Sequence, residues 1–407
     1  MIIYDIKYLF VFSALLFILS SCKPVEIEKE IEGYSICLGE FVTSDAADLF
    51  KSKLDFQLWD KINIQNEDDR KFYVLYGNYN SSFAAGLAAF ELYRKSLIVN
   101  HKVFIKGKYV YDNFNNLLFV TRYQGRPSIY QYNMISKESK LFWSRWGRKV
   151  ITLNHSDDKS IIFFVTALGY GKQGSFPYVR DARIYRFLHT TEQVDELEEL
   201  GTGLQLYTYW DIKDTFKINF TKPDSVNSGL LNQEILSYGT EGKLAPVKNR
   251  TFSISKDGFP KPPKIQPKLI SNSLQKVIRL FQHEGQTYFY LRDSKDGSEI
   301  LIGKFNGFLY DVRWSTDDKY LFLITRDQVI NKSIIENQHD LMIIDTNQKK
   351  LTRTFHGSFY QNLLVHGNFL FFDSRSSGES IITIYDFIND DIYDEIRITG
   401  GCGINNL

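Results

Sequence analysis

Along the first hundred residues, stretches that alternate apolar and polar positions are interrupted by stretches with apolar residues at helical spacing. Alternation predicts strands, and recurrence every three or four residues predicts helices. Thr43 or Ser44 supplies an N-cap for the first helix, and Asn80 or Ser81 supplies one for the second. The order is β-α-β-β-α-β, which predicts a four-stranded sheet with both helices on one face. The segments are strands 34–41, 56–64, 71–79 and 102–106, and helices 45–54 and 82–97.

From residue 108 onward the chain changes to short apolar strands divided by polar turns, and no amphipathic helix is evident. Segments 116–122, 156–166 and 315–326 look like copies of one unit. A repeat of about 45 to 50 residues with about four strands is typical of a β-propeller blade. The pattern therefore predicts an all-β propeller over 108–407. Six blades fit the length best, seven remain open, and a large β-sandwich is the competing fold.

One copy of this unit carries a more specific resemblance. The segment 312–322 (VRWSTDDKYLF) resembles the TolB-like and WD40-like group, in which a W-S-x-D-G-K turn joins two strands of a blade. The resemblance implies that Asp317 and Asp318 occupy a tight turn. Period-two alternation then places neighbouring side chains on opposite faces of the following strand. We expect Leu321 and Leu323 on one face, and Phe322 and Ile324 on the other.

The N-terminal segment also resembles a known module. YSICLGEF, an Ala-rich helix and then FYVLYGNYNSSFAAGLAAFE are similar to a SPOR domain, over residues 33–107. The shared features include Gly39, Phe41, Gly77 and Tyr79. The resemblance implies the small α+β fold predicted above and a peptidoglycan-binding function. It places Cys37 where the family commonly has Gln.

The chain begins with an apolar run at 8–19, which is too short for a helix that spans a bilayer, since about 20 residues are needed. The run leads into Leu19-Ser20-Ser21-Cys22, which resembles the bacterial lipobox. This implies a removable signal peptide at 1–21, lipidation of Cys22 with acyl groups such as palmitate, and a tether at 22–32. The alternatives are an ordinary secretory signal and an uncleaved anchor.

Composition narrows the functional classes. The 407 residues are 43% hydrophobic, 24% charged and 15% aromatic, which is globular and rich in strand-forming side chains. Lys and Arg number 49 against 48 Asp and Glu, so no global positive field attracts the chain to nucleic acid. Nucleic acid is therefore not an expected partner.

Alternation also predicts a binding face on the small sheet. We expect one set of side chains to face the helices: Ile36, Leu38, Val74, Tyr76, Val103 and Ile105. The opposite, open face would carry the glycan-binding candidates Cys37, Trp59, Tyr73, Leu75 and Phe104. Aromatic rings on such a face can stack against sugar C–H groups. The alternative is that this face docks on the propeller, since an apolar surface of that kind requires a cover.

Catalysis has no support in the sequence. The seven histidines show no H-E-x-x-H spacing, no G-x-S-x-G elbow is present, and the glycines form no phosphate loop. We expect no catalytic residues, no metal and no cofactor.

These observations predict a non-enzymatic, lipid-anchored envelope protein. The small domain at 33–107 would bind peptidoglycan and the propeller at 108–407 would bind an envelope protein. The favoured location is the outer membrane, facing the periplasm, with the cell surface as a second location. The alternative function is a surface adhesin or ligand-binding lipoprotein whose small domain is purely structural.

Overall fold

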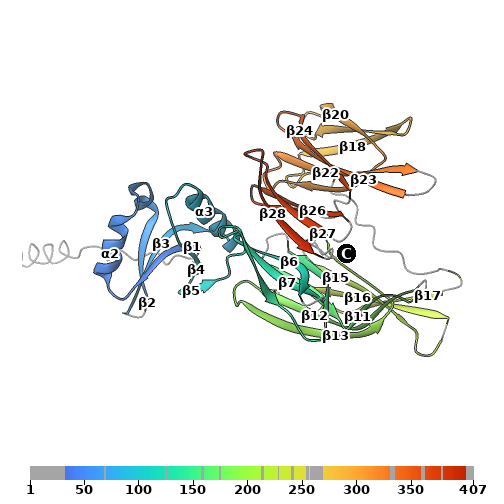
Figure 1. The fold of residues 1–407 in the computed structure, drawn as a ribbon, viewed down its shortest axis with the longest axis horizontal. Coiled ribbons are helices and arrows are strands. Elements are labelled where there is room, and N and C mark those ends of the chain that lie inside the picture. Colours follow the sequence, from blue (N-terminus) through green and yellow to red (C-terminus); the bar gives the residue numbers. More distant parts are fainter. Residues whose placement is uncertain are drawn as a thin grey trace, which may run out of the picture.

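The structure is a computed structural model that describes residues 33–399 except 68–69, 124–125, 157–159, 174–175, 212–214, 228, 240–242, 254–255, 257–268, 331–334, 359–362 and 377–378. The predicted signal, Cys22 and the tether lie outside the described residues. A small unit with two α-helices comes first, and antiparallel sheets make up the rest (Figure 1).

The N-terminal unit has the predicted order of strands and helices. Thr43 caps α2 and Ser81 caps α3, each by accepting a hydrogen bond from a backbone N–H of the first turn. The strands form one antiparallel sheet in the order β2-β3-β1-β4-β5. The elements are β1 Tyr34–Phe41, α2 Ser44–Lys53, β2 Ile62–Glu67, β3 Lys71–Tyr79, α3 Ser82–Arg94, β4 Lys102–Ile105 and β5 Lys108–Val110.

The alternation predicted the helix-facing side of this sheet correctly. All six residues expected there belong to one hydrophobic cluster with side chains of both helices, including Ala47 of α2 and Ala85 and Ala89 of α3. Because the alanines are small, the helices approach the sheet closely. Both helices therefore cover the same face, as the order of elements requires.

Two local predictions were wrong. Residues Phe56–Lys61 form a 3₁₀-helix rather than the start of a strand, because Asp55 caps the segment by accepting from the N–H of Gln57. Leu58 is the buried side chain of this turn, whereas a half-buried strand would bury every second side chain. The sheet also continues beyond the expected boundary at residue 107, since β5 pairs with β4 as a fifth strand.

Six further antiparallel sheets follow in chain order, and we call them blades 1 to 6. Blade 1 contains β6 Asn116–Tyr123, β7 Arg126–Asn133 and β8 Glu138–Trp143. Blade 2 contains β9 Lys149–His155, β10 Ile161–Ala167, β11 Gly169–Gln173, β12 Phe176–Leu188 and β13 Gln193–Gly203. Blade 3 contains β14 Gln205–Trp210, β15 Phe216–Pro223, β16 Leu230–Tyr238 and β17 Lys248–Ser253.

The second half of the chain forms blades 4, 5 and 6. Blade 4 contains β18 Lys276–His283, β19 Gln286–Asp293 and β20 Glu299–Asn306. Blade 5 contains β21 Phe308–Trp314, β22 Tyr320–Ile330, β23 Ile335–Asp345 and β24 Lys350–Ser358. Blade 6 contains β25 Leu363–His366, β26 Phe369–Ser376, β27 Glu379–Asp386 and β28 Asp391–Thr399.

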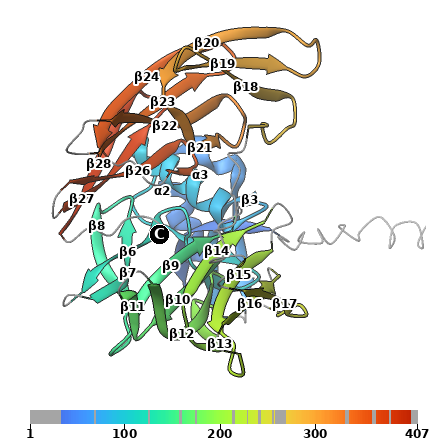
Figure 2. The ribbon, with the colours of Figure 1, turned by 90° about the vertical axis from the view of Figure 1, so that its right-hand side faces the viewer.

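Neighbouring blades are joined by hydrophobic clusters between their faces. Such clusters join blades 1 and 2, 2 and 3, 4 and 5, and 5 and 6, and another joins blade 6 back to blade 1. Within the described residues no cluster joins blade 3 to blade 4. Figure 2 accordingly shows two arcs, β6–β17 and β18–β28, which meet where blade 6 lies beside blade 1.

The turn predicted within blade 5 is present. Asp317 and Asp318 lie between β21 and β22, where Asp317 accepts from the Ser315 hydroxyl and Asp318 has a positive φ of 56°. Leu321 and Leu323 face the core shared with blade 4, whereas Phe322 and Ile324 face the core shared with blade 6. This part of the predicted alternation is confirmed.

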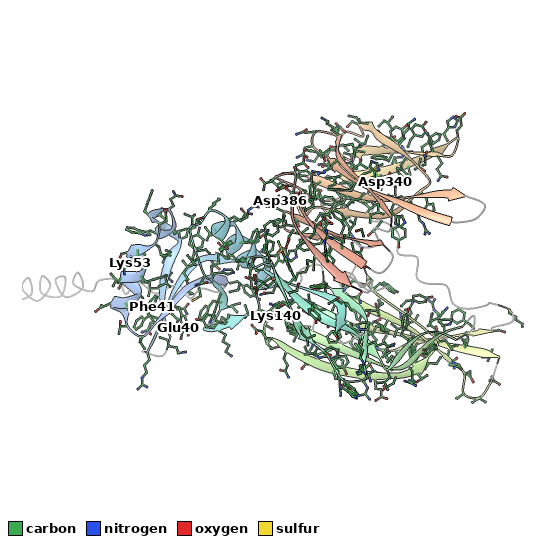
Figure 3. All side chains as sticks on the ribbon, in the orientation of Figure 1. Glu40, Phe41, Lys53, Lys140, Asp340 and Asp386 are labelled. Carbon is green, nitrogen blue, oxygen red and sulfur yellow. The ribbon has the colours of Figure 1, made fainter. Side chains whose placement is uncertain are left out.

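The N-terminal unit joins the propeller through α3. Phe90 is fully buried, with ring centroids 5.6 Å from Phe114, 5.5 Å from Phe369 of blade 6 and 5.8 Å from Tyr393 of β28. The Arg94 guanidinium, one turn later, lies 2.8 Å from an Asp386 carboxylate oxygen. Figure 3 shows Asp386 where the propeller meets the N-terminal unit.

A buried polar network lies under the same helix. His101 Nε2 is 2.8 Å from Asp112 Oδ2, and the Asn115 amide donates to Asp112 Oδ2 and to the carbonyl of Gly86. Burial alone would raise the pKa of Asp112, but the hydrogen bonds with His101 and Asn115 lower it below the ordinary value. Gly86 allows this approach, because a Cβ there would lie 2.2 Å from Asp112 Oδ1.

Candidate binding site on the N-terminal sheet

The sheet face opposite the helices carries an aromatic cluster, which we call the distal face. Cys37, Tyr73, Leu75 and Phe104 form one hydrophobic cluster there, with Tyr109 of β5 packed against it. The Tyr73 and Phe104 ring centroids are 4.7 Å apart, and Tyr109 lies edge-on to both. The structure therefore brings together four of the five predicted side chains.

The fifth residue, Trp59, is not on this face. It belongs to the 3₁₀-helix, where its indole Nε1 donates to the carbonyl of Leu54 at 3.1 Å, and it is 44% exposed. The sequence pattern predicted a strand over 56–64, and strand alternation then placed the Trp59 side chain on the open face of the sheet. Because a 3₁₀-helix turns its side chains by a third of a circle per residue, that count does not apply.

Burial also changes the role expected of the aromatic residues. Tyr73 is 4% exposed and Phe104 is 1% exposed, so neither ring offers a free stacking surface in this structure. The exposed members of the distal face are polar residues around the cluster, which we call the rim. They include Asn63 of β2, which pairs with Leu75, Glu40 of β1, which pairs with Tyr73, and Lys102 of β4, which pairs with Cys37.

These rim residues are linked by charge and hydrogen bonds. Tyr109 donates its hydroxyl to Glu40 Oε2 at 2.8 Å, and Lys71 Nζ lies 3.1 Å from Glu40 Oε1. Lys102 Nζ sits 4.3 Å above the centre of the Tyr109 ring. The hydrogen bond from Tyr109, followed by that from Lys71, lowers the pKa of the Glu40 carboxyl. Glu40 is therefore ionised at neutral pH.

Cys37 is a free, buried thiol at the centre of this network. Burial raises the pKa of the thiol, and its weak contacts to the Tyr109 hydroxyl and the Gly39 carbonyl offset this only in part. A protonated thiol is a poor nucleophile. Cys37 consequently acts here as a small core residue.

The sequence interpretation missed Tyr109 and the charged rim. The predicted boundary at residue 107 places Tyr109 in the following domain. In the structure β4 and β5 form a tight hairpin, and Tyr109 pairs directly with Phe104. Lys71 and Lys102 share their faces with Tyr73 and Phe104 by the same period of two, so the alternation could have identified them. The rim therefore had a local signal that the search for aromatic faces passed over.

The orientation of the distal face follows from how the unit docks. Helix α3 lies between the sheet and the propeller, because Ala85 and Ala89 contact the sheet core while Phe90 enters the core of blades 1 and 6. The alternative in which the distal face docks on the propeller is therefore wrong. Among the described residues, the distal cluster contains only side chains of the N-terminal sheet.

The described residues also show no metal cluster and no membrane-spanning helix. No three His, Cys, Asp or Glu side chains of this part of the chain lie close enough together to hold a metal ion. In the same residues, no helix has both the length and the apolar character needed to cross a membrane.

Comparisons with known proteins found similar solved structures. No family model matches the sequence, and no curated protein does. A periplasmic gluconolactonase of Pseudomonas aeruginosa is 13% identical, with 71% of this chain and 97% of that chain covered and a TM-score of 0.42. TolB of Acinetobacter baumannii is 14% identical, with 85% and 80% covered and a TM-score of 0.39.

A putative 6-phosphogluconolactonase of Bacteroides fragilis is 14% identical, with 71% of this chain and 97% of that chain covered and a TM-score of 0.39. The six successive antiparallel sheets of three to five strands each define the class. The chain is a mostly-β protein whose sheets form a β-propeller. The small sheet with two helices precedes this propeller and is joined to it by α3.

Proposed function

We propose that this protein is a non-enzymatic binding protein of the bacterial envelope, anchored by lipid at Cys22. In this proposal the N-terminal unit is a SPOR-like module that binds the glycan strands of peptidoglycan, and the propeller binds a protein partner. The favoured location is the outer membrane, facing the periplasm.

The observation that carries the proposal is the position of the distal face. The helix layer separates this face from the propeller, and the face presents polar side chains around an aromatic cluster. A surface with that composition suits a ligand that has both hydroxyl groups and C–H faces. Glycan strands have both.

The rim supplies the hydrogen-bonding groups that a sugar requires. Lys71 and Lys102 donate, Glu40 accepts, and Asn63 can do both. The backbone pairing of β1, β2, β3 and β4 fixes the spacing of these four residues, so the rim is preorganised. The glycan would therefore contact the rim first and not the buried Tyr73 and Phe104 rings.

Cosedimentation of the full-length protein in detergent with purified sacculi tests the proposal. Lys102→Glu places a carboxylate where the ammonium now covers the Tyr109 ring, and removes the three donors of that ammonium. We expect this variant to bind about fivefold more weakly, which corresponds to about 1 kcal/mol. Sacculi stripped of stem peptides should bind the parent equally well, because the proposed ligand is the glycan.

A matched control is Lys53→Glu, which makes the same charge change on α2. Lys53 is exposed on the helix side of the unit, away from Glu40, as Figure 3 shows. The control should bind like the parent. If both variants lose binding equally, the attraction is nonspecific, and if the parent does not cosediment at all, the glycan function is wrong and the adhesin with a structural small domain replaces it.

A further inference from the structure

One tryptophan of the propeller is held out in solvent. Trp146 lies in the connection between β8 of blade 1 and β9 of blade 2, and it is 85% exposed. Among the described residues, no aromatic side chain is more exposed. Single exposed apolar side chains are common on protein surfaces, so the informative feature is how this one is held.

Trp146 occupies the second position of a tight turn. The Arg148 N–H donates to the Arg145 carbonyl at 3.1 Å, and Gly147 between them has a φ of 75°. A positive φ at the third position is typical of a type II turn, and glycine adopts it without strain. The turn also lies against Leu168, because a Cβ at Gly147 would be 3.6 Å from Leu168 Cδ2. The backbone therefore fixes the point from which the indole projects.

Both ends of this turn are tied to blade 2 by charged hydrogen bonds. Arg145 Nη1 donates to the Tyr185 hydroxyl at 2.5 Å and to the Glu196 carboxylate. Arg148 is 6% exposed, and its Nη1 donates to Asp181 Oδ2 at 3.0 Å. Hydrogen bonds between charged partners are the stronger ones in proteins. The turn is thus preorganised, and a ligand that contacts Trp146 does not have to order it.

Arg126 of β7 covers one face of the indole. Its guanidinium carbon lies 4.3 Å from the centre of the Trp146 ring. Arg145 and Arg148 each have a carboxylate partner, whereas Arg126 forms no ion pair with any residue that the structure describes. An uncompensated guanidinium therefore lies beside an exposed ring.

We propose that Trp146 and Arg126 anchor an extended, acidic segment of a partner protein to the propeller. The proposal rests on the function above, in which the propeller binds a protein, and it names the contact. The segment would place an apolar side chain, such as Pro or Leu, against the open face of the indole. A carboxylate of the same segment would accept two hydrogen bonds from Arg126, since a guanidinium stacked on a ring keeps its N–H groups available at its edge.

The charge selects this occupant. A neutral glycan could stack on the indole but would leave the Arg126 charge uncompensated, whereas a carboxylate compensates it. Tryptophan and arginine are also the side chains that most often carry the binding energy of protein interfaces. Ring and charge together therefore favour an acidic protein segment over a sugar.

Fluorine NMR of the full-length protein in detergent, labelled with fluorotryptophan, tests the proposal. The probe is the capped peptide Glu-Pro-Leu-Glu-Pro-Leu-Glu, and the control peptide has Gln in place of each Glu. We expect the probe to shift the Trp146 resonance saturably and to leave that of Trp59, which is 44% exposed, unchanged. The Gln peptide should bind about tenfold more weakly. An unmoved Trp146 resonance at millimolar probe, or equal affinity for the two peptides, would overturn the proposal.

Matched variants separate the ring from the charge, with affinity measured by the anisotropy of a labelled probe. Trp146→Ala should weaken binding about thirtyfold, as expected of a hot-spot residue. Phe56→Ala removes another exposed ring, on the N-terminal unit, and should bind like the parent. Arg126→Gln should weaken binding about tenfold. Arg250→Gln makes the same charge change at an exposed position of β17 and should have no effect. Parent-like affinity of Trp146→Ala would contradict the proposal.

Three further readouts distinguish this proposal from its competitors. A shift of the Trp146 resonance by diacetylchitobiose, without one by the acidic peptide, would mean that the indole stacks on sugar. A dimer in light scattering that Trp146→Ala dissociates would mean that the occupant is a second copy. Trp146→Ala should still cosediment with sacculi. A parent that cosediments but does not bind the probe contradicts the anchor alone, and a parent that binds the probe but not sacculi contradicts the glycan function alone.

Discussion

The two helices of the N-terminal unit cover the same sheet but differ in what lies on their other side. On α2, Ala47 is the buried residue and Leu49 is 58% exposed. On α3, six residues are buried, and they include both the alanines that contact the sheet and Phe90, which contacts the propeller. A helix buried on two sides connects two cores. The comparison therefore indicates that the unit and the propeller form one cooperative structure rather than two independent modules.

Truncation of Phe90 tests most directly whether α3 connects the two cores. Phe90→Ala empties the core between α3 and blades 1 and 6, and a fully buried Phe of this kind is worth about 3 to 5 kcal/mol. Leu49→Ala on the exposed side of α2 should change stability by less than about 0.5 kcal/mol. Urea unfolding followed by fluorescence measures both. A small effect of Phe90→Ala would mean that the two cores are independent.

Gly86→Ala should reverse the usual helix preference. Alanine favours a helix over glycine by about 1 kcal/mol. At Gly86, however, the new Cβ would lie 2.2 Å from Asp112 Oδ1 and 2.8 Å from Phe114 Cβ. We expect a net destabilisation of about 1 to 3 kcal/mol, measured by the same unfolding experiment. On α2, Ala46→Gly provides the reverse change and should cost up to about 1 kcal/mol from propensity alone. A stabilising Gly86→Ala would contradict the close approach of α3.

The buried Asp112 should make the junction sensitive to acid. Its pKa in the folded protein is lowered, so its contribution to stability is complete above the pKa of the unfolded chain, near 3.9. That contribution is lost as the pH falls from there through the lower folded value, at up to about 1.4 kcal/mol per pH unit. Unfolding at pH 6 and pH 3 should therefore show a smaller loss for Asp112→Asn than for the parent. Equal losses would place the acid sensitivity elsewhere.

The same contrast explains which parts of the fold could be predicted. Helix α3 reads SFAAGLAAFELYR, with apolar residues on nearly every side, whereas α2 reads SDAADLFKSK, with one apolar stripe. A helix that is apolar all round is buried all round. The sequence thus holds a signal that α3 has a second partner, but it does not say that the partner is the space between blades 1 and 6.

The distal face shows the limit of local patterns. Alternation assigned Cys37, Tyr73, Leu75 and Phe104 to that face, because side-chain direction in a strand depends only on position along it. It could not assign their burial, which depends on packing among β1, β3, β4 and the added strand β5. The error at Trp59 has the same origin, since an Asp55 cap decided between a strand and a 3₁₀-helix.

By itself the sequence determined the order of strands and helices in the N-terminal unit, the helix-facing side of its sheet, the Asp317 and Asp318 turn and the succession of propeller strands. The element order, the sheet face and the succession of strands follow from side-chain periodicity and capping, which act over a few residues, whereas the Asp317 and Asp318 turn was implied by the resemblance of 312–322 to a known turn motif. Only the tertiary structure decided that α3 docks on the propeller and that Tyr73 and Phe104 are buried. Those features depend on contacts between residues that are far apart in the chain, as Phe90 and Phe369 are, and no local pattern records such a pairing.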